Sequence, residues 1–202
     1  GRSTLGFGAR RLFDDDRMPA KYLNTPETIV YKKSHVLYGL DLARTHIGKK
    51  NQAVVVEGYT DVMACHIAGV DTAVASCGTA FGTDHSRMIA RLMTADAQTG
   101  EVIFTFDGDA AGLRAMEKSL RLALPMGFDV RLLLLPQGED PDTWCMALGA
   151  EAFRELMGRA PGWTDFIIGR ALEGKDLRRT TDRMEALRDL AAFLTWLPPS
   201  PE

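Results

Sequence analysis

The stretch Glu101-Val-Ile-Phe-Thr-Phe-Asp-Gly-Asp109 decides the fold class of this chain. Its first six residues are an apolar run, rich in β-branched and aromatic side chains, with the length of a buried strand. The run stops at Asp107-Gly108-Asp109. A second run, Ala53-Val-Val-Val56, stops in the same way at Glu57-Gly58. The two stretches therefore predict buried strands that end in carboxylates.

Strands and helices alternate on either side of these two runs. Strands are expected at 53–56, 72–75, 101–106 and 130–135. Helical spacing lies between them, with one helix capped by Thr60, one by Thr83 or Asp84, and one closed by Pro125 and Gly127. Such alternation predicts βαβ units. We expect an α/β fold with a parallel-rich sheet flanked by helices.

The two ends of the chain differ from this middle part. Residues 1–50 show no strong period and contain turn-forming residues, so short irregular strands in a small α+β segment are expected there. Residues 143–202 are helical in character, and the last helix is expected near 180–197. Its apolar stripe needs a partner, and comprises Met184, Leu187, Ala191 and Leu194. The expected organisation is thus 1–50, 51–142 and 143–202.

Carboxylates gather where the predicted strands end. Parallel strands meet at one edge of an open sheet, and sites form at the carboxyl ends of such strands. The acidic residues expected at this edge are Glu57, Asp61, Asp107, Asp109, Asp140 and Asp142. So many anions repel one another unless a cation neutralises them, and an all-oxygen ligand set selects Mg²⁺ or Mn²⁺. Each motif alone is more often a solvated turn, but together they predict a metal site.

Charge is distributed unevenly along the chain. The net charge is −3, yet residues 1–50 hold ten Lys/Arg against five Asp/Glu, and the remainder holds fourteen against twenty-two. A basic arm on an acidic body suggests that one part contacts phosphates and the other holds metal. Cys65, Cys77 and Cys145 are far apart, which argues against a structural zinc site or a disulfide framework. With no signal peptide or membrane-length apolar run, we expect a cytoplasmic protein.

The motifs resemble a known family. Val56-Glu-Gly-Tyr-Thr-Asp-Val62 and Phe106-Asp-Gly-Asp-Ala-Ala-Gly112 look like a Toprim domain, which topoisomerases, bacterial primases and some nucleases share. Gly6-Phe-Gly-Ala-Arg10, Lys21-Tyr-Leu-Asn-Thr-Pro-Glu-Thr28 and Leu135-Pro-Gln-Gly-Glu-Asp-Pro-Asp142 resemble DnaG-type bacterial DNA primases. The likeness runs in order to about residue 150 and fades beyond it.

This resemblance implies metal-dependent synthesis of RNA primers on a single-stranded DNA template from ribonucleoside triphosphates. It implies that Glu57, Asp107 and Asp109 are the catalytic, metal-binding core. Asp61, Asp140 and Asp142 would be further ligands or groups that orient the metal. The residues implied to face template or nucleotide are Arg10, Lys21, Tyr22, Asn24 and Lys33.

The resemblance also places other functions outside this chain, which we interpret as a piece of a longer protein. The zinc-binding domain expected at the N-terminus of such a primase and its C-terminal helicase-binding domain are not in this sequence. A monomer with no membrane partner is expected. Two alternatives stay open: a Toprim topoisomerase or nuclease, and a non-catalytic nucleic-acid-binding module.

Overall fold

The architecture described here is that of a computed structural model. It describes residues 4–11, 13, 20, 22–76, 78–93, 100–106, 110–136 and 139–195. Three predicted site residues, Lys21, Asp107 and Asp109, lie outside this part of the chain.

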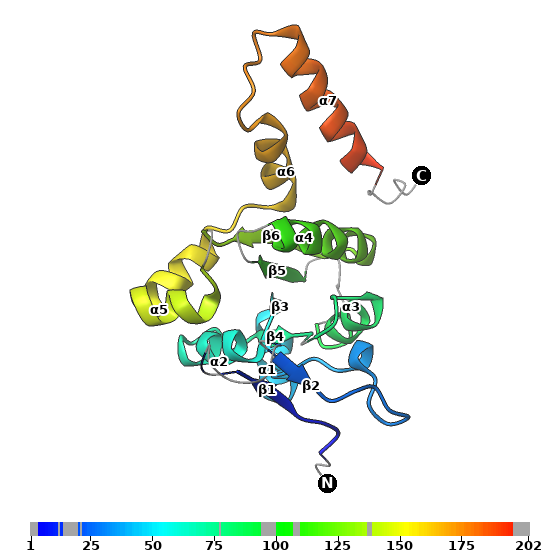
Figure 1. Ribbon diagram of the computed structural model, residues 1–202, viewed down its shortest axis with the longest axis vertical. Coiled ribbons are helices and arrows are strands. Elements are labelled where there is room, and N and C mark those ends of the chain that lie inside the picture. The colour runs from blue at the N-terminus through cyan, green and yellow to red at the C-terminus, as the bar shows by residue number, and fades with distance from the viewer. Residues whose placement is uncertain are drawn as a thin grey trace.

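A four-stranded parallel sheet forms the centre of the protein (Figure 1). Its strands are β3 (Gln52–Val56), β4 (Ala73–Ala75), β5 (Glu101–Phe106) and β6 (Asp129–Leu134). They lie in the order β4-β3-β5-β6, and each neighbouring pair is parallel. The predicted strands are therefore confirmed to within one or two residues, as is the α/β class.

Helices cover both faces of this sheet because successive strand side chains point to opposite sides. The helices are α1 (Leu40–Lys50), α2 (Tyr59–Ile67), α3 (Thr83–Ala90), α4 (Ala110–Ala123) and α5 (Pro141–Gly158). Val54 and Val56 belong to an apolar cluster with α2 and α5. Ala53 and Val55 belong to the cluster on the other face, with α1, α3 and α4. This layering explains why the strands read as continuous apolar runs.

Two helices begin at a glycine cap and not at the threonine or aspartate that the sequence suggested. The N-cap residue is Gly58 for α2 and Gly82 for α3, both with extended backbone. In each case the side chain three residues later accepts a hydrogen bond from the glycine N–H. Asp61 Oδ2 is the acceptor at 2.8 Å in α2, and His85 Nδ1 is the acceptor at 3.0 Å in α3. A residue at the third helical position thus replaces the expected hydroxyl or carboxylate cap.

The N-terminal segment contains a small antiparallel ribbon and a helix. The ribbon pairs β1 (Gly8–Arg10) with β2 (Tyr22–Asn24), which confirms the expected short strands. A 3₁₀ turn, η1 (Lys33–His35), follows. Helix α1 was not predicted. Its core face carries mainly Ala43 and Ile47, one helical turn apart. Two buried residues give only a weak apolar periodicity, so the sequence gives little indication that this helix packs against the sheet.

The C-terminal part is helical, as expected. A 3₁₀ turn, η3 (Leu124–Met126), closes α4, and α5 kinks at Gly149. Helices α6 (Trp163–Leu172) and α7 (Thr180–Leu194) then extend beyond the β6 edge of the sheet (Figure 1). The predicted stripe of α7 is exposed, with Met184, Leu187 and Leu194 each about half exposed or more. Within the described residues, no helix is both long and apolar enough to cross a membrane.

Candidate active site

The carboxyl ends of β3, β4 and β5 surround a cavity of about 200 Å³. Glu57 follows directly on β3 and lines this cavity with an exposed side chain. Val55 of β3 lies opposite Phe104 of β5, so the two strands end side by side. Asp107 follows Phe106, the last residue of β5, in sequence. The sheet register therefore supports the prediction that the glutamate and the Asp-x-Asp pair belong to one strand edge.

Asp61 lies beneath the turn that carries Glu57. Its side chain is only 5% exposed, and its Oδ2 accepts the 2.8 Å hydrogen bond from Gly58 N–H. A Cβ at Gly58 would lie 3.1 Å from the Tyr22 hydroxyl and 3.3 Å from Asp61 Oδ2, so this turn has little room for a side chain. The buried carboxylate fixes the backbone that presents Glu57.

Two more predicted acids lie at the start of α5. Asp140 is the N-cap residue of this helix, and its Oδ1 accepts from Thr143 N–H at 2.8 Å. Thr143 Oγ1 accepts from Asp140 N–H at 2.9 Å, which completes a reciprocal capping box. Asp142, in the first turn, accepts a 2.9 Å hydrogen bond from Arg10. One oxygen of each carboxylate is therefore already hydrogen-bonded within the protein.

Arg10 connects the N-terminal ribbon to α5. The hydrogen bond that it donates to Asp142 is the main cause that raises the pKa of Arg10 above its ordinary value. Burial opposes this rise, and the charges of Tyr22, Asp142 and Asp140 add to it. The guanidinium also lies over the ring of Tyr22, 5.9 Å from its centre, in a cation–π arrangement. The family resemblance placed Arg10 among the residues that face template or nucleotide, but it did not predict the pairing of Arg10 with a candidate metal ligand 132 positions away.

A cluster of aromatic rings joins this ribbon to α2. Tyr59 packs edge-on against Tyr38, with ring centres 4.8 Å apart, and its ring is tilted against that of Tyr22 at 6.2 Å. The Tyr59 hydroxyl donates to Asn24 Oδ1. The Tyr22 hydroxyl lies 3.3 Å from Thr60 Oγ1. A neighbouring cavity of about 430 Å³ is bounded by residues that include Arg10, Tyr38 and Tyr59. Tyr22 and Asn24 thus lie close to the Glu57 turn, and Tyr59 has a packing role.

The backbone of Lys33 is held by His85 of helix α3. His85 is fully buried, and its Nε2–H donates to the Lys33 carbonyl at 3.0 Å while Nδ1 accepts from Gly82. Lys33 N–H in turn donates to Glu27 Oε1 at 3.0 Å. The spacing of Gly82 and His85 was the available signal, because a polar side chain three residues after a glycine suits a cap.

The residues expected at the metal edge fit a hard cation by their chemistry. Glu57, Asp140 and Asp142 offer carboxylate oxygens, and Asp61 supports the turn beside them. Among the described residues, no three acidic, histidine or cysteine side chains form a group that could hold a metal ion. Asp107 and Asp109 are outside that set, so the metal ligation predicted for them stays a prediction.

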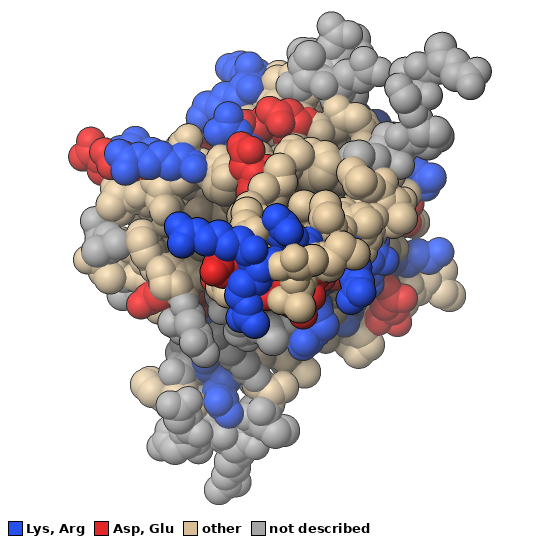
Figure 2. Space-filling view, turned by 90° about the horizontal axis from the view of Figure 1, so that it is seen from above, with Lys and Arg blue, Asp and Glu red and all other residues tan. Residues whose placement is uncertain are grey.

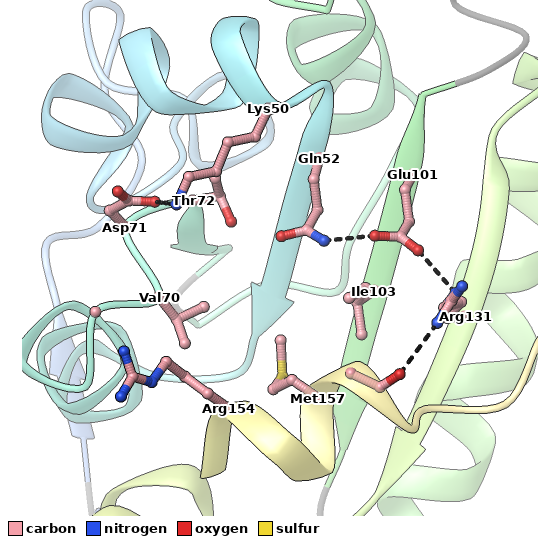
Figure 3. Close-up of a pocket in the computed structure, with 12 residues that line it drawn as sticks. Lys50, Gln52, Val70, Asp71, Thr72, Glu101, Ile103, Arg131, Arg154 and Met157 are labelled. Carbon is pink, nitrogen blue, oxygen red and sulfur yellow. Dashed lines mark hydrogen bonds and ion pairs between the residues drawn. The ribbon is translucent and has the colours of Figure 1, made fainter. Parts of the chain in front are cut away.

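The opposite edge of the sheet has a cavity of about 430 Å³ with a different character (Figure 3). Here each carboxylate is already paired with a cation. Asp71 accepts from Lys50 at 2.6 Å, and Glu101 pairs with Arg131 at 2.7 Å while also accepting from Gln52. The two carboxylates that line this cavity lie on different strand ends and each has a basic partner, so they do not form a repelling acidic cluster of the kind that favours a metal ion.

Basic and acidic side chains also alternate on the face shown in Figure 2. At this end of the molecule Lys175 pairs with Asp189 at 2.6 Å, and Arg170 pairs with Glu173 at 3.1 Å. No broad surface of one charge sign appears in this view of the described residues.

Two sequence families match this chain. Residues 54–145 match the Toprim-like family, and residues 1–44 match the N-terminal domain of the DNA primase catalytic core. The DNA primase of Mycolicibacterium smegmatis is 52% identical over 192 residues, which are 95% of this chain and 30% of that protein. This chain thus spans about three tenths of the length of that curated relative.

Solved structures agree with the sequence matches. The RNA polymerase domain of Mycobacterium tuberculosis primase DnaG has a TM-score of 0.83 and 47% identity, over 96% of this chain and 62% of that one. A DnaG primase catalytic domain bound to single-stranded DNA has a TM-score of 0.76 and 36% identity, over 96% and 61%.

Proposed function

Because this chain belongs to the bacterial DnaG-type DNA primase family, we propose that it forms part of a primase catalytic core that synthesises short RNA primers on single-stranded DNA. The reaction is nucleotidyl transfer, in which a 3′-hydroxyl attacks the α-phosphate of a ribonucleoside triphosphate and pyrophosphate leaves. We assign residues 1–50 to the end of a basic N-terminal subdomain, 51–142 to the Toprim domain and 143–202 to a helical subdomain.

The observation that carries this proposal is the convergence of strand ends. Glu57 lines the cavity at the carboxyl edge, beside the strand that Asp107 and Asp109 continue in sequence. Asp140 and Asp142 follow the next strand of the same sheet, at the start of α5. Binding of nucleic acid without chemistry would give no reason to concentrate carboxylates, which repel phosphates.

We assign metal ligation to Glu57, Asp107 and Asp109, with Asp140 and Asp142 as further ligands or groups that orient them. Bound there, Mg²⁺ or Mn²⁺ would activate the attacking hydroxyl and neutralise charge on the phosphates. Asp61 acts through the backbone, since its hydrogen bond to Gly58 N–H holds the turn next to Glu57.

We assign template and nucleotide contacts to the N-terminal ribbon and the segment that follows it. Arg10, Tyr22 and Asn24 lie beside the Glu57 turn or the start of α5, and Lys33 is positioned through the buried His85. By family resemblance, Lys21 belongs to the same set. Such contacts with phosphates fix position on DNA without reading sequence, so binding should weaken as salt rises.

The test is synthesis of RNA from labelled ribonucleotides on single-stranded DNA with Mg²⁺ or Mn²⁺. We would compare the wild type with Asp107→Ala, in this 202-residue chain and in a chain extended to the length of its relatives. Asp165→Ala, an exposed acid on α6, serves as the control for loss of a carboxylate. We expect RNA products that Asp107→Ala abolishes and Asp165→Ala leaves intact.

Two results would contradict the proposal. One is a folded, extended chain that binds metal but makes no RNA. The other is nicking or relaxation of supercoiled plasmid by the same protein, which would favour a Toprim nuclease or topoisomerase.

A further inference from the structure

Arg10 and Asp142 form an ion pair between two parts of the chain that the sequence separates widely. Arg10 is the last residue of β1, and Asp142 lies in the first turn of α5. One guanidinium N–H donates to Asp142 Oδ2 at 2.9 Å, and the two side chains are 28% and 23% exposed. A protein cation is therefore paired with a carboxylate to which the proposed function gives a role in binding a divalent metal ion, as a further ligand or an orienting group.

We propose that Arg10 is the exchangeable counter-cation of Asp142. A divalent metal ion that enters at this carboxylate competes with the guanidinium, and its binding releases Arg10 to face an anionic phosphate. This inference rests on the metal role of Asp142 in the proposed function. It adds that metal binding opposes the contact that the β1–β2 ribbon makes with α5 through Arg10.

Helix α5 does not depend on this ion pair for its start. Asp140 and Thr143 already satisfy the first turn through their reciprocal hydrogen bonds of 2.8 and 2.9 Å. The pair is also partly open to water, which limits its strength. Release of Arg10 from Asp142 would therefore leave the helix cap in place.

A released Arg10 would remain near the Glu57 turn. Its guanidinium lies over the ring of Tyr22, whose hydroxyl is 3.3 Å from Thr60 Oγ1 on α2. The ring gives the cation a second support that does not involve Asp142. A guanidinium with five N–H donors in a planar fork is suited to bind a phosphate in this position.

Electrostatics sets the sign and size of the expected effect. A unit positive charge paired with a carboxylate would oppose the binding of a divalent ion at that carboxylate, and the partly exposed setting would screen that repulsion. Removing the charge of Arg10 should therefore tighten metal binding, by about three- to tenfold. By thermodynamic reciprocity, the metal loosens the hold of Asp142 on Arg10 by the same factor.

The test is Mn²⁺ affinity, measured on the 202-residue chain by electron paramagnetic resonance of free Mn²⁺. The variants form a double-mutant cycle of Arg10→Gln, Asp142→Asn and both together. We expect Arg10→Gln to bind Mn²⁺ about three- to tenfold more tightly, and to have less than about a twofold effect once Asp142 is Asn.

Two further variants separate competition from general charge and from misfolding. Arg170→Gln removes the same charge from an exposed pair with Glu173 on α6, and should leave Mn²⁺ affinity unchanged. Arg10→Lys keeps the charge and should bind Mn²⁺ like the wild type. Circular dichroism and thermal melting show whether each variant is folded.

An unchanged or weaker Mn²⁺ affinity in folded Arg10→Gln would overturn the inference, because Arg10 would then hold Asp142 in place for the metal. A folded wild type that binds no Mn²⁺ would overturn it together with the proposed metal site. Mn²⁺ binding that responds to Arg10 through Asp142, in a protein that makes no RNA, would support the inference and contradict the proposed function alone.

Discussion

Replacement of Asp61 tests whether the turn beside Glu57 is held from below. In Asp61→Ala the buried Gly58 N–H loses its 2.8 Å acceptor, and the helix α2 loses the carboxylate of its first turn. Loss of such a capping group costs about 1–2 kcal/mol. For a chain of this size that amounts to a melting temperature lower by about 2–8 °C.

Asp165 offers a control at the equivalent helical position. It is the third residue of α6, which also follows a glycine N-cap, but its exposed side chain makes no capping hydrogen bond. Asp165→Ala should cost only the interaction of a surface charge with the helix dipole, about 0.3–1 kcal/mol. The excess loss in Asp61→Ala then measures the contact with Gly58.

The assay is urea unfolding followed by circular dichroism, with Mn²⁺ binding measured on the same variants. Asp61→Asn keeps an oxygen acceptor and should lose less than half as much stability as Asp61→Ala. Equal losses for Asp61→Ala and Asp165→Ala would refute the reasoning, because the buried hydrogen bond would then contribute nothing beyond the dipole.

Two further predictions concern a close contact and a buried thiol. Gly78 has φ +76°, and a Cβ there would lie 2.1 Å from Asn24 Nδ2, whereas Gly174 has φ +69° with nothing within 4 Å. Backbone strain costs about 1–3 kcal/mol in either variant. Gly78→Ala should also clash with Asn24, so it should lower the free energy of unfolding in urea more than Gly174→Ala does, and it should weaken nucleotide binding. Equal losses of stability in the two variants would contradict the contact with Asn24. Burial raises the pKa of the Cys65 thiol, with a smaller effect from Cys145, so the native thiol should resist iodoacetamide at pH 8, as peptide mapping would show. Since the unfolded thiol ionises from about pH 8.5, the free energy of unfolding should fall as pH rises above that value, and less steeply in Cys65→Ala.

Local sequence determined the central sheet and the edge at which the acids lie. Strands such as 101–106 are continuous apolar runs, so both of their faces must be buried. Because these strands alternate with helices along the chain, a parallel sheet is the expected arrangement. Once the strands are parallel, residues that follow them must meet at the carboxyl edge. Glu57, Asp140 and Asp142 lie beyond the ends of β3 and β6 for this reason.

The formation of helix α1 and the first residues of helices α2 and α3 depended on contacts that the sequence does not show. In α1 the buried Ala43 and Ile47 are too few to give a clear period, and burial against the sheet stabilises the helix. Helices α2 and α3 begin after Gly58 and Gly82 because the side chain three residues later accepts a hydrogen bond from the glycine N–H. That side chain can reach the N–H only when the helix has formed.

The sequence by itself determined the fold class, the candidate acids and the basic character of the N-terminal arm, because each depends on local composition and spacing. Only the tertiary structure decided which of these groups meet. The pair of Arg10 with Asp142 joins residues 132 positions apart, and the hold of His85 on Lys33 joins residues 52 apart. Periodicity carries no information about such contacts, since they arise only when packed elements bring distant side chains within hydrogen-bonding distance.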